Sequence, residues 1–461
     1  MNSKNNDTQM NFAERRATWG LGAVFSLRML GMFMVLPVLT TYGMTLQDAS
    51  ESLIGLAIGI YGLMQAILQI PFGLWSDRFG RKPLIVGGLL IFTLGSIIAA
   101  LTTSIWGIIL GRALQGSGAI AAAVMALLSD LTREQNRTKA MAFIGISFGI
   151  TFAIAMVCGP IITHAIGLHG LFWVIAALAL AAIVLTLFFV PDSSVHILNR
   201  DSGMVRGSFG TVLRNHSLFK LNIGIFCMHF LLMSTFVALP VQLELSGFPA
   251  ASHWQIYLYT MLIAFITVLP PIIYAESKRK MRRVFIFCVA VLLIAEAILW
   301  LADTSFWPLV VGVLLFFIAF NLMEALLPSW VSKEAPAGYK GTAMGIYATG
   351  QFLGVACGGT TGGWLAAHTG AHTVFLFGIG LTLAWLLLSF TMREPPYLAS
   401  LRLTLDSKQT LPNNAQQQLM QMAGVHQVLL VPEEHSIYIK IDSKITSRKQ
   451  LEMFISTITN K

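Results

Sequence analysis

The sequence predicts an all-α polytopic membrane protein with twelve transmembrane helices in two six-helix bundles, followed by a small C-terminal α+β domain. Of its 461 residues, 56% are hydrophobic and 11% are charged, whereas charged residues make up about a quarter of a soluble domain. Apolar stretches long enough to cross a bilayer recur along the chain, and a weak internal repeat divides them into two sets. Beyond residue 395 this apolar pattern ends and short alternating segments begin.

Each predicted span is an apolar stretch of about twenty residues, the length that crosses the hydrocarbon core as a helix. The twelve stretches cover residues 17–40, 52–74, 84–102, 104–128, 140–163, 169–191, 218–241, 254–275, 284–302, 305–328, 342–366 and 371–392. Lys and Arg occur in the loops after the even-numbered spans up to the tenth, and none occurs in the loops after the odd-numbered spans. Because positively charged loops remain in the cytoplasm, both termini are expected there. The net charge of +9 therefore reflects topology and not nucleic-acid binding.

An internal repeat supports two halves of six helices. Residues 129–141 read SDLTREQNRTKAM and residues 332–344 read SKEAPAGYKGTAM, so that Ser and Ala-Met recur at a separation of 203 positions. Parallel repeats of this kind build many transporters. The predicted organisation is a cytoplasmic N-terminal tail, an N-terminal bundle, a polar and basic cytoplasmic connector, a C-terminal bundle and a cytoplasmic domain, at residues 1–16, 17–191, 192–216, 217–393 and 398–461.

The last 64 residues, 398–461, predict a small sandwich of strands and helices. Leucines alternate with polar residues at 401–405, an amphipathic run follows at 412–423, two strand-like runs cover 425–431 and 437–441, and a final helix begins near Ser447. The order βαββα fits a ferredoxin-like domain that lacks one strand. It contains no Cys-x-x-Cys pair, so no metal ligands are indicated.

Several function classes find no support in the sequence. The four cysteines lie apart within apolar runs, and no Gly-x-x-x-x-Gly-Lys-Ser/Thr loop is present. No arrangement of nucleophile and base points to an enzyme. We therefore expect no catalytic residue, metal, cofactor, nucleotide or nucleic acid. The expected partners are the lipid bilayer and a small-molecule substrate, with protons as a candidate co-substrate.

The loop between the second and third predicted spans, residues 73–82, reads GLWSDRFGRK. Gly73 and Gly80 allow a close turn, and Asp77 and Arg81 lie four positions apart, where they can form a pair. Together with Arg78, these residues resemble the signature loop of the major facilitator superfamily. A solvated turn that only follows the positive-inside rule is the alternative.

Other segments extend this resemblance over the whole membrane part. RALQGSG at 112–118 resembles the superfamily's fourth-helix motif, with a buried arginine at Arg112 that is either a proton-coupling residue or a brace for backbone carbonyls. Gly145, Gly149 and Gly159-Pro160 resemble the fifth-helix motif of its antiporters and are expected to face the seam between the two halves. Ile161 and Ile162 depart from that motif, which weakens the inference of antiport. The phrase LGMFMVLPVLTTYG and the extra domain resemble a bacterial inner-membrane branch of the superfamily.

The resemblance implies that two halves rock about a central cavity. We hypothesise that Asp77 contacts the start of the eleventh span, at residues 341–343, when the cavity faces outward, because exposed amides there carry positive partial charge. Arg81 would hold Asp77 and reach Asp130 at the end of the fourth span. This conformational latch comprises Gly73, Asp77, Arg78, Gly80, Arg81 and Asp130.

Few titratable groups lie within the spans. Glu324, behind Asn321 in the tenth span, is the preferred proton carrier, with a packing carboxylate as its alternative, and Glu296 lies in a span that is usually peripheral in the superfamily. Arg28, His229 and Asn321 are candidates for the substrate cavity, although Arg28 can equally brace a neighbouring helix and His229 can be a hydrogen-bonded core residue.

Two function classes remain. The first is secondary active transport, proton-coupled export of small organic molecules by alternating access. The second is a ligand-binding membrane sensor that signals through its cytoplasmic C-terminal domain. The repeat and the complete signature loop favour the transporter.

Overall fold

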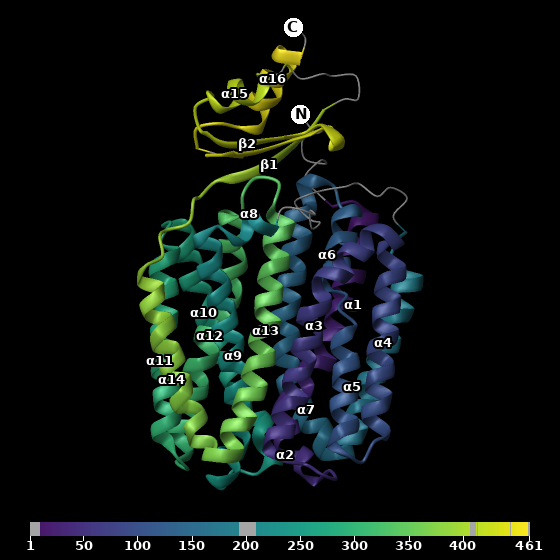
Figure 1. Cartoon of the computed structure of the whole chain (residues 1–461), viewed down its shortest axis with the longest axis vertical. Helices are drawn as coiled ribbons and strands as arrows, with labels where there is room; N and C mark the ends of the chain where they lie inside the picture. Colours follow the sequence, from purple (N-terminus) through teal and green to yellow (C-terminus); the bar gives the residue numbers. More distant parts are fainter. Residues whose placement is uncertain (1–9, 193–208, 406–411, 413, 443, 460–461) are drawn as a thin grey trace.

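The computed structural model describes residues 10–192, 209–405, 412, 414–442 and 444–459. Its long helices stand side by side in two adjacent bundles, and the small C-terminal domain lies over one end of them (Figure 1). We call this the domain end, and the opposite end, where α2 lies, the far end. Most of the expected connector, residues 193–208, and residues 1–9 of the expected tail lie outside the described residues.

The first bundle begins at the domain end and contains two broken helices. Its elements are α1 (Phe12–Met34), α2 (Leu36–Tyr42), η1 (Gly43–Thr45), α3 (Glu51–Phe79), α4 (Arg81–Leu101), α5 (Ile105–Ser117), α6 (Ala121–Asp130), α7 (Glu134–Val184) and the π-helical turn η2 (Leu185–Phe189). Pro37 opens α2, where its missing N–H costs little. Residues 118–120 separate α5 from α6, and the two helices together form one candidate span.

The second bundle follows the short helix α8 (Phe209–Leu213). It consists of α9 (His216–Leu245), η3 (Ala250–Ser252), α10 (His253–Ser277), α11 (Met281–Ala302), α12 (Phe306–Glu334), α13 (Lys340–Thr369) and α14 (Ala371–Phe390). The last helix, α14, ends at the domain end, on the side of the second bundle away from α1, and the chain continues from there into the C-terminal domain (Figure 1).

The predicted fold class is confirmed, although the spans are distributed unevenly over the helices. Within the described residues, ten segments are long and apolar enough to cross a membrane. One of them, of 51 residues, holds two spans, because Gly167 (φ 76°, ψ 175°) interrupts α7. The 30-residue α13 is not among the ten; its many glycines and threonines lower its hydropathy. Counting α7 twice and adding α13 gives the twelve predicted spans.

Apolar side chains cover the outer faces as well as the core. Large exposed examples are Leu90, Leu94, Ile266, Leu301 and Trp307. A soluble monomer rarely exposes so much contiguous apolar surface, whereas lipid-facing helices require it.

The two bundles meet most closely near the far end, where α3 crosses α13. A Cβ atom on Gly55 would lie 2.5 Å from the Gly359 carbonyl oxygen, and one on Gly59 would lie 2.5 Å from that of Ala356. Gly363 similarly approaches the Gly55 backbone. Small residues thus allow backbone contact across the seam.

The C-terminal domain has the predicted βαββα order. Its elements are β1 (Ala399–Thr404), α15 (Ala415–Met420), β2 (Val425–Val431), η4 (Pro432–Glu434), β3 (Ser436–Ile441) and α16 (Arg448–Thr459). The strands form one antiparallel sheet in the order β1-β3-β2. Leu419, Leu451 and Ile455 from the helices pack on Ile437 and Ile439 of the central strand.

Candidate functional site

The structure brings Asp77, Arg81 and Asp130 together at the domain end of the first bundle. Gly80 (φ 94°) turns the chain sharply between α3 and α4, so that Arg81 at the start of α4 lies next to Asp77 in the last turn of α3. Arg81 Nε donates to Asp130 Oδ2 across 3.0 Å, and Nη1 donates to Ser76 Oγ at 2.9 Å and to Asp77 Oδ1. We call Asp77, Arg81 and Asp130 the charged network.

The remaining residues of the signature loop take different positions. Gly73 is buried and its carbonyl accepts a hydrogen bond from Ser76 Oγ, which leaves a lone pair of that oxygen to accept from Arg81. Arg78 is exposed, with its guanidinium over the Phe79 ring at 5.5 Å. In the described part of the chain, the polar contact of Asp77 is with Arg81, and no contact joins it to residues 341–343. The expected contact across the seam is therefore not made in this conformation.

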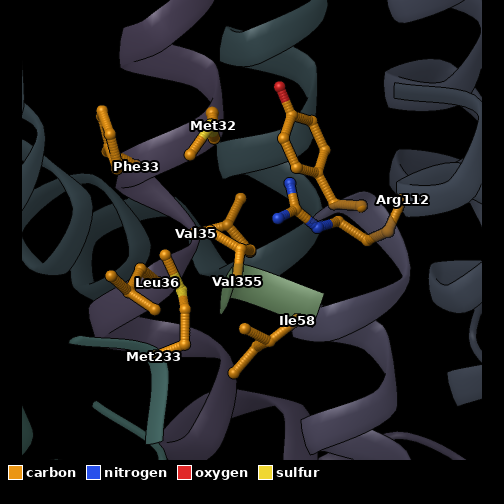
Figure 2. A pocket seen from close by; sticks show the side chains of 9 residues that line it. Met32, Phe33, Val35, Leu36, Ile58, Arg112, Met233 and Val355 are labelled. Atoms are coloured by element: carbon orange, nitrogen blue, oxygen red, sulfur yellow. The ribbon is translucent and has the colours of Figure 1, made fainter. Parts of the chain in front are cut away.

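Arg112 lies in the interior of the first bundle, close to the seam. Its Nη1 donates to Gln115 Oε1 at 2.8 Å, its Nε approaches the Ala57 carbonyl at 3.4 Å, and its guanidinium stacks on Tyr61 at 4.6 Å. Beside it is a cavity of about 10 Å³, close to the room that one water needs. Apolar residues of both bundles line this cavity, among them Met233 and Val355 of the second (Figure 2). The seam is thus nearly closed here.

Arg28 of α1 is fully buried against α3 and α4. Its Nη2 donates to Gln65 Oε1 at 2.6 Å, and Gln65 Nε2 donates to Gln69 Oε1 at 3.0 Å. Its guanidinium lies 5.8 Å from the centre of the Phe92 ring. These contacts are all within the first bundle, so they correspond to the bracing alternative more closely than to a cavity wall.

His229, Glu324 and Gln351 meet inside the second bundle, from α9, α12 and α13. His229 Nε2 lies 2.8 Å from Gln351 Nε2 and 3.9 Å from Glu324 Oε2, and Nδ1 lies 3.3 Å from the Ile225 carbonyl. A tautomer with the proton on Nδ1 satisfies both hydrogen bonds. Glu324 Oε2 is buried without a hydrogen-bond partner among the described residues, as is the hydroxyl of Tyr347. We call His229, Glu324, Tyr347 and Gln351 the buried polar cluster.

Asn321 lies one turn before Glu324 but does not join this cluster. Its Nδ2 donates to the Phe317 carbonyl at 2.8 Å and approaches Met261 Sδ at 3.6 Å. Glu296 lies elsewhere in the second bundle, where it accepts a hydrogen bond from Thr235 Oγ1 at 2.9 Å and occupies the space beside Gly378.

An aromatic chain crosses the seam beside the buried polar cluster, and the sequence analysis missed it. Phe152 of α7 contacts Phe33 of α1 at 4.8 Å and Phe320 of α12 at 5.5 Å between ring centres. Phe320 in turn lies 5.6 Å from the His229 ring. Phe148 and Phe152, spaced four apart on α7, could have indicated an aromatic face, but not which helix it meets.

The fifth-helix motif does not face the seam as a unit. A Cβ atom on Gly159 would lie 2.4 Å from the Met34 carbonyl of α1, so Gly159 packs within the first bundle, and for it the expectation was wrong. Only Gly149 approaches the second bundle, with Phe265 at 3.7 Å from its Cβ position, and Gly145 has open space around it. Pro160 lies inside α7. Helix contact inside the bundle explains the small residue at Gly159.

Family models and relatives agree on the kind of protein. The model of the Major Facilitator Superfamily matches residues 21–356 and 282–413, and that of the YajR YAM domain matches residues 401–457. The chain is 67% identical over 450 residues to the "Inner membrane transport protein YajR" of Escherichia coli (strain K12), covering 98% of this chain and 99% of the relative. It is 27% identical over 376 residues to "Multidrug resistance protein 2" of Bacillus subtilis (strain 168), covering 77% of this chain and 92% of the relative.

Solved structures with low sequence identity share the fold. The human organic anion transporter MFSD10 has a TM-score of 0.62 at 19% identity and covers 82% of this chain and 100% of its own. A D-xylose-proton symporter has a TM-score of 0.64 at 16% identity and covers 83% of this chain and 97% of its own.

Proposed function

Since the chain belongs to the Major Facilitator Superfamily, we propose that it exports small organic molecules in exchange for protons, by alternating access between two bundles. It is a multi-pass inner-membrane transport protein and not an enzyme. The coupling to protons, the direction of transport and the cytoplasmic position of both termini are parts of the proposal.

The observation that carries the proposal is the position of Glu324. Its carboxyl group lies among membrane-spanning helices, with His229 Nε2 at 3.9 Å and no Lys or Arg in an ion pair with it in the described chain. Placing an ionisable group inside the membrane costs free energy, so a carboxyl group at such a position indicates a function. A carboxyl group whose access to water changes as the bundles tilt can take up a proton on one side and release it on the other.

The aromatic chain gives the substrate a place to bind. Phe152 and Phe320 contact each other across the seam, so these rings must separate when the bundles part. Flat apolar faces then become available next to Glu324 and His229, a combination that suits organic molecules with an aromatic part and one polar group.

The charged network sets the relative populations of the two conformations, one closed at the far end and one closed at the domain end. In this conformation the bundles are in backbone contact at the far end, and Asp77 is 27% exposed at the domain end. We propose that Asp77 contacts the amides at the start of α13 only when the domain end closes. Such a contact with a helix N-terminus contributes on the order of 1 kcal/mol, which changes populations several-fold without fixing one of them.

The test is transport by the full chain in proteoliposomes. The relative named Multidrug resistance protein 2 guides the probes: tetraphenylphosphonium, a neutral aromatic dye and an anionic dye, each with and without a pH gradient. We expect gradient-driven flux of at least one probe and its loss in Glu324→Gln, with binding retained.

Glu296→Gln is the matched control, because Glu296 is also buried in the second bundle but bonds to Thr235. Flux that still follows the pH gradient in Glu324→Gln would remove the proton role of this residue. Binding of probes without any flux would favour the sensor.

A further inference from the structure

The second bundle carries an ion pair at its own domain end, with a lysine at the position that corresponds to Asp130. Lys333, 203 positions after Asp130, ends α12, and Glu276 ends α10 as Asp77 ends α3. Lys333 Nζ lies 2.5 and 2.7 Å from the two carboxylate oxygens of Glu276. In the second bundle the positive charge thus lies at the end of α12, whereas in the first it is that of Arg81, the first residue of α4.

The C-terminal domain contacts the chain at this same corner. Lys440 of β3 is 2% exposed, and its Nζ donates to the carbonyl of Lys333 at 2.6 Å. This carbonyl is in the last turn of α12, where carbonyl groups lack helical partners and carry partial negative charge. A lysine of the sheet therefore satisfies the end of a membrane-spanning helix.

The loop between α12 and α13 packs on the face of the sheet. The amide of Ala337 donates to Gln427 Oε1 at 3.1 Å, and the Ala337 side chain is buried against Val431 and Tyr438. Gly338 has φ +75°, and a Cβ atom there would lie 2.6 Å from Leu429. The positive φ favours glycine at this contact, and a Cβ atom would in addition displace the end of the Leu429 side chain.

Tyr397, in the segment that leads into the domain, completes the corner. Its ring centre lies 5.5 Å from Lys333 Nζ, and its hydroxyl oxygen accepts a hydrogen bond from the Met281 amide at 3.2 Å. Lys333 is therefore held by α10 through its ammonium group, by the domain through its carbonyl and by Tyr397 through its ring.

We propose that the C-terminal domain is a docked regulatory partner of the second bundle. Its binding surface is the corner formed by residues 333–339, and docking there fixes the domain end of α13. Because α13 is the helix that contacts α3 across the seam, fixing its end biases the tilt between the bundles. The docking surface stands by itself, whereas its effect on tilt rests on the proposed alternating access.

Docking is tested by hydrogen exchange of the full chain in lipid nanodiscs. Gln427→Ala removes the acceptor of the Ala337 amide from an exposed position, and Lys440→Met removes the bond to Lys333. Both are expected to accelerate exchange in residues 333–341 by up to about tenfold, the effect of one lost hydrogen bond. Lys444→Met, an exposed lysine of the same domain, is the control that leaves exchange unchanged.

A second pair of variants alters the loop between α12 and α13 instead of the C-terminal domain. Gly338→Ala introduces both backbone strain and the collision with Leu429, whereas Gly247→Ala has the same kind of strain (φ +84°) with nothing within 4 Å. Only Gly338→Ala is expected to expose residues 333–341. Unchanged exchange within β2 and β3 shows that the domain remains folded. If all of these variants exchange like the unmodified chain, the domain is not docked and the inference is wrong.

The effect on tilt is measured by spin-label distances across the domain end. Labels at the exposed positions Ala13 and Lys278, in a chain whose four cysteines are replaced, report one bundle each. We expect Gln427→Ala and Gly338→Ala to shift the population of the two distances, and the two controls to leave it unchanged. Faster exchange with identical distances would overturn the regulatory role. A single distance in the unmodified chain at every pH and with every probe would instead contradict alternating access, while the exchange result still decides the docking.

Discussion

Arg81 and Asp130 form a buried ion pair that joins the start of α4 to the end of α6. Arg81 Nε lies 3.0 Å from Asp130 Oδ2, and the two side chains are 7% and 2% exposed. The same guanidinium also bonds to Ser76 and Asp77 at the end of α3. One side chain thus connects three helix ends of the first bundle, and losing a partner would leave a poorly hydrated charge.

Asp130→Asn is therefore expected to destabilise the folded protein. Breaking a buried pair by removing one partner costs about 3 kcal/mol, so we expect a clearly lower midpoint of thermal unfolding in detergent, followed by tryptophan fluorescence. Asp192→Asn is the matched control, because Asp192 pairs with Lys82 at 2.8 Å but is 86% exposed. Such a surface pair contributes about 0–1 kcal/mol. Equal midpoints for the two variants would show that Arg81 does not depend on Asp130.

Asp77→Asn tests the latch without removing the buried pair. The amide still accepts a hydrogen bond from Arg81 but carries no charge for the start of α13. We expect the population with a closed domain end to fall several-fold, measured by spin-label distances across that end, and transport to slow. Arg283→Gln is the control, since Arg283 is an exposed arginine at the start of α11 that is not part of the latch. If Asp77→Asn leaves both distances and transport unchanged, the latch hypothesis is refuted.

The fold could be predicted from the sequence because the burial of apolar side chains in the bilayer dominates the free energy of inserting each helix. A span needs about twenty apolar residues whatever its neighbours are, so even the glycine-rich α13 was recognised from its residues. The contact between Asp77 and Arg81 could be predicted from their spacing in the sequence. Asp77 and Arg81 are four residues apart next to Gly80, a spacing at which an acid and a base can pair.

The contacts between bundles could not be predicted, because they depend on which face each helix presents. Phe152 and Phe320 lie in spans where almost every residue is apolar, so periodicity does not single them out. The small size of Gly159 suggested a position in the seam, but a small residue is equally needed where α7 packs on the backbone of α1 at Met34. The docking of Lys440 on Lys333 joins positions 107 residues apart, and two lysines give no sign of attraction in the sequence.

The glycines of α3 give a prediction about the far end. Gly59 allows α3 to touch α13, because a Cβ atom there would lie 2.5 Å from the Ala356 carbonyl oxygen and 3.2 Å from the Thr360 amide. Both neighbours are backbone atoms, which cannot move away as a side chain can. Gly59→Ala is therefore expected to separate the helices at the far end at a cost of about 1–3 kcal/mol, which lowers the population of this closed seam at least about fivefold.

Gly87→Ala is the control for this prediction, since Gly87 is also a helical glycine of the first bundle but has nothing within 4 Å of its Cβ position. Spin labels at the exposed positions Thr103 and Thr369 measure the distance across the far end. We expect longer distances in Gly59→Ala and unchanged distances in Gly87→Ala. Because a protein that alternates must close one end as it opens the other, the domain-end distance should shorten in the same Gly59→Ala sample. A far end that opens while the domain end stays fixed would mean that the two bundles bend and do not rock as rigid bodies.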